Sequence, residues 1–211
     1  MARKTPEESQ KTRDAILNSA ERVFITFGVG ESTINHISLD SGFSRGAIYG
    51  HYTNKVEICL SVIKRAIKDE QPLKHDIKSD VLEYLLSSAV IYLKKITQPG
   101  SIKNIIEIIY FKTENTDENA PILRWKKFID RFILNKIKIS LKRAVASGEL
   151  PEDLDLVLCS FYLSALFEGI YDTCKWSYED VSDEIINSLE RILRFAIFNL
   201  KESNCNGILK K

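Results

Sequence analysis

Apolar residues recur at spacings of three and four along almost the whole chain, and this periodicity most strongly limits how the chain can fold. Ile16, Ala20, Val23 and Phe27 form the first such row, which stops at Gly28. Residues spaced in this way lie on one face of an α-helix, whereas a half-buried strand needs strict alternation. Because no alternating stretch of useful length occurs, the sequence predicts an all-α protein of about nine helices.

Glycine, proline and short polar stretches divide this pattern into segments. A first helix over about residues 7–27 precedes three shorter helices, which begin after Thr33, Ser44 and Asn54. The 211 residues can therefore hold an N-terminal three-helix domain, residues 1–53, and a larger helical domain, residues 54–211. The helices predicted beyond Pro72 cover residues 79–97, 101–114, 120–147, 154–177 and 181–200.

The net charge of the whole chain says little about its partners, but the distribution of charge along the chain is informative. Thirty Lys and Arg residues nearly balance 29 acids, for a formal net charge of +1. Between residues 41 and 55, however, the chain carries Arg45, His51 and Lys55 and no acid. Because local fields steer association, this segment could face phosphates although the whole chain is almost neutral.

Several classes of protein are excluded by what the sequence lacks. The cysteines at 59, 159, 174 and 205 are far apart without a C-x-x-C pair, which predicts buried, reduced thiols rather than a metal or disulfide framework. The N-terminal segment is polar and no apolar run is long enough to span a bilayer, so we expect a cytoplasmic protein without membrane contact. No Gly-rich phosphate loop, H-E-x-x-H or G-x-S-x-G is present, so we expect neither catalysis nor a cofactor.

The segment STINHISLDSGFSRGAIYGHY has the local chemistry of two short helices that cross at a fixed angle. Thr33 and Ser44 are suited to cap the two helices, and Gly42 can take the left-handed conformation that the turn needs. Ile34, Ile37 and Ile48 would form the buried face between them. This pattern predicts a helix-turn-helix, in which the second helix enters the major groove of DNA.

The run GFSRGAIYGHYTNK resembles the DNA-binding signature of the TetR family, and the N-terminal half is similar to the AcrR-like branch of that family. The likeness covers about fifty residues and departs at Gly50, where relatives often carry an aromatic residue. It implies a homodimeric transcriptional repressor on a palindromic double-stranded operator. Arg45 would contact a base edge, and the phosphate contacts would come from Thr33, Ser44, Tyr49, His51 and Lys55.

The segments IIEIIYFKTEN and LPEDLDLVLCSFYLSALFEGIYDTCKW are similar to the matching helices of AcrR-like efflux repressors. This resemblance implies a small-molecule pocket and control of an efflux system. Glu168 stands in an otherwise apolar run, and an acid inside a pocket would suit a cationic amphipathic effector, while the resemblance implies release by a hydrophobic or cationic small molecule. By resemblance the pocket would include Ile106, Tyr110, Ser164 and Glu168, and facing aromatic residues add Tyr84, Tyr92, Phe128, Phe132 and Phe167.

The last two long helices carry more apolar residues than one face can bury, which predicts one face for the core and another for a second subunit. A fully enclosed central helix is the alternative. Glu168 could also be exposed or paired with a lysine, and the aromatic residues could be ordinary core. A regulator of lipid or other metabolism, or a helical DNA-binding protein without small-molecule control, remain the alternative functions.

Overall fold

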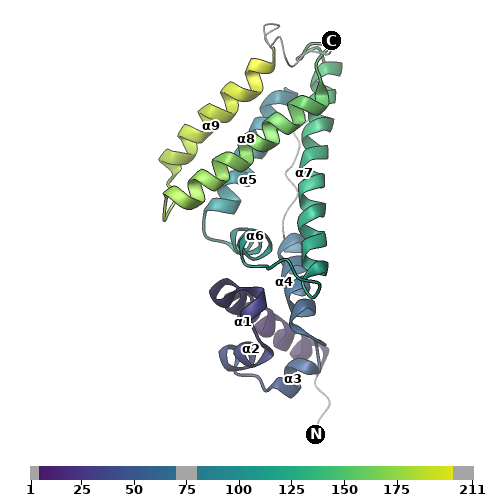
Figure 1. Ribbon diagram of the computed structural model, residues 1–211, viewed down its shortest axis with the longest axis vertical. Coiled ribbons are helices and arrows are strands. Elements are labelled where there is room, and N and C mark those ends of the chain that lie inside the picture. The colour runs from purple at the N-terminus through teal and green to yellow at the C-terminus, as the bar shows by residue number, and fades with distance from the viewer. Residues whose placement is uncertain (1–4, 70–79, 202–211) are drawn as a thin grey trace. The chain divides into compact units, whose positions relative to one another are not determined.

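The computed structural model describes residues 5–69 and 80–201. Across these two ranges the chain forms nine α-helices and one 3-10 turn, with no strand, so the all-α prediction is confirmed (Figure 1). The elements are α1 (Pro6–Glu31), α2 (Ile34–Ser41), α3 (Arg45–Tyr49), α4 (Lys55–Asp69), α5 (Val81–Thr97), α6 (Ser101–Phe111), α7 (Ala120–Ala146), α8 (Leu156–Ser177), α9 (Asp183–Phe198) and η1 (Asn199–Lys201).

The chain divides into two compact units. The first comprises residues 1–71 and 100–127, and therefore holds α1 to α4, α6 and the start of α7. The second comprises residues 72–99 and 128–211, with α5, the rest of α7, α8 and α9. The first compact unit therefore contains α6 together with the predicted helix-turn-helix. The division between a DNA-binding domain and an effector-binding domain at residue 53 stays a prediction.

In the first unit, α1 packs against α2, α4 and α6. The apolar row that marks α1 in the sequence forms the centre of this core, since Ile16, Ala20 and Phe24 are fully buried. Each large apolar side chain buried in this way contributes about 1.5–3 kcal/mol. The row ends at Phe27, which is 50% exposed.

The helix α1 is longer than the sequence predicted. Gly28 interrupts it with a φ of 76°, as expected, but the chain then makes a further helical turn to Glu31. The backbone N–H of Val29 donates to the carbonyl of Lys112 at 2.7 Å, and this bond from the α6–α7 connection replaces the intrahelical partner lost at the glycine. The extension therefore depends on a segment more than eighty residues away.

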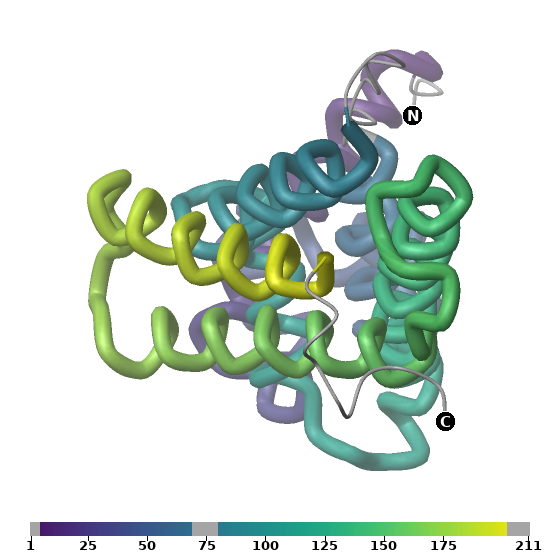
Figure 2. Tube along the Cα trace, turned by 90° about the horizontal axis from the view of Figure 1, so that it is seen from above, coloured from purple at the N-terminus to yellow at the C-terminus, as the bar shows by residue number. Residues whose placement is uncertain are grey.

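In the second unit, α5 packs against α8 and α9, which lie side by side (Figure 2). The first turn of α5 is capped by Glu149, whose carboxylate accepts from the backbone N–H groups of Val81 and Leu82 at 3.0 and 3.1 Å. Burial alone would raise the pKa of Glu149, but hydrogen bonds from Asp80, Ser147 and these amides outweigh it and lower that pKa to about 2. A distant carboxylate therefore stabilises the start of α5.

The thiols follow the sequence prediction where the structure describes them. Cys59, Cys159 and Cys174 are buried, and Cys205 lies outside the described residues. Burial raises the pKa of Cys59 to about 12, so this thiol is protonated near neutral pH. Among the described helices, none is both long enough and apolar enough to cross a membrane.

Candidate nucleic-acid interface

The turn between α2 and α3 is built from two caps and one left-handed glycine. The hydroxyl of Thr33 accepts from the N–H of His36 at 3.1 Å, and that of Ser44 accepts from the N–H of Ala47 at 3.2 Å. Gly42 has a φ of 72°, a conformation that side chains rarely adopt. These three predictions of local structure are confirmed.

The two short helices are held against α1 by burial and by a polar tie. Ile37 of α2 and Ile48 of α3 are fully buried as predicted, whereas Ile34, at the start of α2, is only half-buried. The hydroxyl of Ser19 donates to the carbonyl of Ile37 at 3.2 Å inside the core. At the surface, Arg22 pairs with Asp40 at 2.5 Å, and this hydrogen bond lowers the pKa of Asp40. The orientation of α2 relative to α1 is therefore fixed by one contact in the core and by another at the surface.

The outer face of α3 is open and carries the predicted reading residues. Arg45 is exposed, and Tyr49 is 56% exposed. A Cβ at Gly46 would meet nothing closer than the Ser44 hydroxyl at 3.9 Å, so this glycine is not needed for packing within the chain. Its small size leaves room for a close approach by another molecule. Gly50, the departure from the family pattern, ends α3 with ordinary helical dihedrals.

Two aromatic residues follow α3 and differ in environment. His51 is half-buried, and its ring centroid lies 6.4 Å from that of Tyr52. Tyr52 itself is 4% exposed, and the Arg13 guanidinium lies 5.8 Å from its ring centroid. Burial raises the pKa of Tyr52 above its usual range. Tyr52 is a core residue that anchors the end of the helix-turn-helix, whereas His51 keeps part of its surface.

Lys55, the first residue of α4, has a structural partner that the sequence did not reveal. Its ammonium donates to the carbonyl of Gly30 at 2.6 Å, and the carboxylate of Glu118 lies 4.0 Å away. The Lys55 side chain is 16% exposed. An ammonium has three N–H donors, so two remain for a further acceptor such as a phosphate oxygen.

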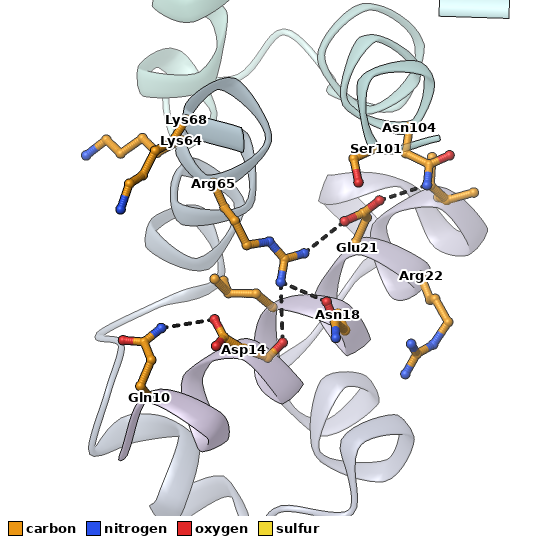
Figure 3. A pocket seen from close by; sticks show the side chains of 12 residues that line it. Gln10, Asp14, Asn18, Glu21, Arg22, Lys64, Arg65, Lys68, Ser101 and Asn104 are labelled. Atoms are coloured by element: carbon orange, nitrogen blue, oxygen red, sulfur yellow. Dashed lines mark hydrogen bonds and ion pairs between the residues drawn. The ribbon is translucent and has the colours of Figure 1, made fainter. Parts of the chain in front are cut away.

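A carboxylate on α1 connects three helices, and sequence reasoning missed it. Glu21 accepts from Arg65 of α4 at 3.0 Å and from the amide of Asn104 of α6 at 2.7 Å (Figure 3). Arg65 also donates to Asn18 at 2.7 Å. The side chain of Glu21 is only 12% exposed, so its two bonds are little screened by water. An open, mainly polar groove of about 870 Å³ surrounds these residues.

The candidate effector residues fall into both compact units. Ile106, which is buried, and Tyr110, whose ring has the Lys126 ammonium 4.9 Å from its centroid, belong to the first. In the second unit the ring of Phe167 stacks on that of Tyr92 at 5.7 Å. Burial raises the pKa of Tyr92 to about 12.

The remaining effector candidates are half-buried or exposed. Ser164 donates to the carboxylate of Glu168 at 3.4 Å, one turn along α8. Glu168 is exposed, whereas its apolar sequence context suggested an enclosed acid. Tyr84 is half-buried, and Phe132 is 50% exposed with its ring 6.0 Å from that of Phe128. The ligand-binding roles of these residues stay predictions.

The helices α8 and α9 leave an apolar face uncovered in the single chain. The side chains on this face are between 42% and 75% exposed. Isolated apolar residues on a surface are ordinary, but seven exposed apolar side chains on two adjacent helices are more than isolated exposure and are typical of an interface. The group comprises Val157, Leu158, Phe161, Tyr162, Trp176, Ile192 and Phe195.

These features define a helix-turn-helix DNA-binding protein with a larger helical C-terminal region. Residues 16–62 match the family model for "Bacterial regulatory proteins, tetR family", and residues 80–193 match that for "MAATS-type transcriptional repressor, C-terminal region". The second match alone covers more than half of the chain, and the chain therefore belongs to the TetR family of transcriptional repressors. Because this family consists of regulators, the prediction that the chain is not an enzyme is confirmed.

Individual relatives agree with this assignment. The chain is 32% identical over 177 residues to the transcriptional regulator SrpR of Pseudomonas putida, covering 81% of this chain and 80% of SrpR. It is 27% identical to TtgR of Pseudomonas putida over 195 residues, 90% of this chain and 92% of TtgR. The solved structure of MexZ, described as a key repressor responsible for antibiotic resistance in Pseudomonas aeruginosa, is 38% identical, with a TM-score of 0.88 over 96% of this chain and 100% of MexZ.

Proposed function

We propose that this chain is a homodimeric cytoplasmic repressor that binds a palindromic operator and is released by a hydrophobic or cationic small molecule, so controlling an efflux system. The observation that carries the DNA-binding half is the open face of α3, where Arg45 and Tyr49 are exposed on a helix whose other side is fully buried. The efflux half rests on the similarity of the segments in α6 and α8 to the matching helices of AcrR-like efflux repressors, and on the likeness to MexZ, described as a key repressor responsible for antibiotic resistance.

On the DNA, Arg45 contacts a base edge and the surrounding side chains bind phosphates. Arginine to guanine is the commonest specific contact in the major groove. The hydroxyls of Thr33 and Ser44 accept their capping bonds, so each O–H stays available to donate to a phosphate oxygen. Tyr49, His51 and Lys55 are the remaining phosphate-binding residues. Phosphate contacts position the helix-turn-helix on the duplex but do not specify the base sequence.

Dimerisation through α8 and α9 supplies the second reading helix. Burying the exposed apolar face of these helices against a second copy is favourable, and a twofold axis places the two α3 helices about 34–36 Å apart on one side of the duplex. A palindromic operator follows from this symmetry.

Release requires an effector that prefers the arrangement unable to bind DNA. As effector-binding residues we propose Ile106 and Tyr110 in the first unit, and Tyr84, Phe132, Ser164, Phe167 and Glu168 in the second. Because α6 is bonded through Asn104 to Glu21 of α1, movement of α6 would reach the helix on which α2 and α3 pack. A coupling of about 1–3 kcal/mol is typical and changes operator affinity roughly 5–150-fold.

The test is operator binding by Tyr49→Ala and Arg45→Ala, measured by fluorescence anisotropy on DNA from upstream of the chain's own gene. Tyr49→Ala should weaken binding to all sequences alike, because it removes a phosphate contact. Arg45→Ala should lose about 1–3 kcal/mol of discrimination at one base pair in each half-site. Lys64→Ala, exposed on α4, serves as the control, and unchanged affinity in both test variants would refute the proposed interface.

The effector is tested separately with Glu168→Gln. Operator release by ethidium, a cationic aromatic probe, should require a higher concentration in this variant, whereas release by neutral 1-naphthol should not change. Equal loss of potency for both probes would assign Glu168 a structural role. Release by neither probe would favour a repressor without small-molecule control.

A further inference from the structure

The groove around Glu21 is lined by residues that neither the DNA-binding nor the effector proposal uses. Its volume of about 870 Å³ is within the range of small-molecule sites, but its lining is mainly polar, whereas most such sites are largely apolar (Figure 3). All the lining residues belong to the first compact unit. The groove is therefore a feature of the unit that contains the helix-turn-helix.

Helical periodicity places polar side chains from three helices along this groove. Residues that are three or four apart share one face of a helix. The polar residues on these faces include 10, 14, 18 and 21 of α1, 64, 65 and 68 of α4, and 101 and 104 of α6. Each of the three helices thus contributes at least two polar groups to the same surface.

Two of the cations that line the groove are already paired. The guanidinium of Arg65 bonds to the carboxylate of Glu21 at 3.0 Å. Arg22 pairs with Asp40, which is not part of the lining. Neither arginine therefore contributes an unpaired charge to the groove.

Lys64 and Lys68 supply the unpaired positive charge. Both are exposed, and within residues 5–69 and 80–201 neither forms a hydrogen bond or an ion pair, although Lys64 is attracted at longer range to Glu57 of the same helix. They are one turn apart, about 6 Å along the helix axis, and like charges at this spacing repel each other. Asp14 is the remaining acid of the lining, and the amide of Gln10, which donates to it at 3.0 Å, does not neutralise its charge. The groove therefore has an excess of one positive charge.

The start of α6 adds hydrogen-bond donors to the same groove. The N-cap of this helix is Gly100, which has no side chain to accept from the first N–H groups. These groups also lack partners within the helix, and in this state they favour an anion. Ser101, the exposed first residue of α6, lines the groove and adds a hydroxyl. The donors of α6 and the two lysines therefore select the same kind of ligand.

We propose that this groove is a second small-molecule site, which takes a polar molecule with two anionic groups, carboxylate or phosphate, spaced to pair with both lysines. Ammonium groups form charge-assisted hydrogen bonds with either kind of oxygen. The effector proposed above is hydrophobic or cationic, so the two sites would select ligands of opposite chemistry. Because the groove is bounded by α4 and by α1, on which α2 packs, its ligand would act on the DNA-binding unit independently of that effector.

The experiment is isothermal titration calorimetry on the full chain at constant ionic strength. Citrate and fructose 1,6-bisphosphate are the carboxylate and phosphate probes, and acetate, with a single charge, is the reference. At least one of the two multivalent probes should bind saturably and raise the thermal midpoint of unfolding, because a ligand of the folded state stabilises it. Acetate should do neither. The probe that binds more tightly identifies the anionic group of the ligand.

Three variants test the assignment to this groove. Lys64→Gln with Lys68→Gln removes two exposed charge pairs and should weaken probe binding about 5–30-fold. Asp14→Asn removes the opposing acid and should tighten binding about 2–5-fold, a gain that misfolding cannot produce. Ser101→Trp should block binding, because the larger side chain fills the groove while both lysines remain.

The matched control is Lys138→Gln with Lys142→Gln, which removes two exposed lysines of the same spacing from α7, outside the groove, and should leave probe binding unchanged. The proposal is overturned if neither multivalent probe binds saturably, or if the control weakens binding as much as the groove variant. It is also overturned if Asp14→Asn fails to tighten binding. Loss of operator affinity by Lys64→Gln with Lys68→Gln in the absence of any probe would assign the lysines to DNA instead, whereas the α3 variants described above test the DNA-binding function itself.

Discussion

The geometry around Lys55 predicts two separable effects of Lys55→Met. The variant keeps a long apolar side chain but removes the ammonium that donates to the Gly30 carbonyl at 2.6 Å. A hydrogen bond to a charged group contributes about 1.5–3 kcal/mol, and the side chain is only 16% exposed. Glu118, at 4.0 Å and 60% exposed, adds at most about 1 kcal/mol. The free energy of unfolding should therefore fall by about 1.5–3 kcal/mol.

The same substitution should change how operator binding responds to salt. If the two remaining N–H groups of Lys55 contact a phosphate, each subunit loses one neutralised charge. The slope of log affinity against log salt should then become less steep by about 0.9 per subunit, or roughly 1.8 for a dimer.

Urea unfolding by far-UV circular dichroism measures the first effect, and anisotropy titrations of labelled operator across a range of KCl concentrations measure the second. Lys64→Met, an exposed lysine on the same helix, should show neither. A loss of stability with an unchanged salt slope would refute the phosphate contact and leave Lys55 as a tie between α4 and α1. A shallower slope without loss of stability would refute the structural role.

Three further test substitutions, two of them with a control substitution, follow from contacts described above. Gly42→Ala should cost about 1–2 kcal/mol in urea unfolding because φ is 72°, whereas Gly46→Ala, with an open Cβ position, should not destabilise. Glu149→Gln should be less stable than the wild type at neutral pH. Because the folded pKa of Glu149 is lowered to about 2 from an ordinary 4.5, this difference should be complete above about pH 5 and close as pH falls toward 2. Asn104→Asp places a second carboxylate against Glu21 and should destabilise at pH 7 but much less at pH 4, while Asn18→Asp, beside Arg65, should not.

Local chemistry allowed the reading helices to be predicted. The caps Thr33 and Ser44 act on backbone groups three residues away, and Gly42 acts through its own dihedral, so each is visible in a short stretch of sequence. The burial of Ile37 and Ile48 follows from helical periodicity.

The missed features all depend on contacts between distant segments. Glu21 meets Arg65 and Asn104, which are 44 and 83 residues further along the chain, and no local pattern distinguishes it from an exposed helical acid. The extension of α1 past Gly28 needs the Lys112 carbonyl, and the Val81 amide at the start of α5 needs Glu149 in addition to the local N-cap Asp80. Glu168 shows the limit of local context, since its apolar neighbours in sequence do not enclose it in the single chain, and exposure was the alternative that the sequence left open.

The bond between Asn104 and Glu21 has a consequence for the order of binding events. The bond joins α6 to α1 inside one compact unit, and α1 is the helix on which α2 packs. A shift of α6 would therefore change the free energy of the helices that read DNA as well as that of α6 itself. Thermodynamic linkage is reciprocal: an effector that weakens operator binding by a given factor is itself bound more weakly by that factor when the operator is occupied. A repressor seated on its operator would therefore need a higher effector concentration for release than the free protein needs for saturation, and the unbound pool would respond first.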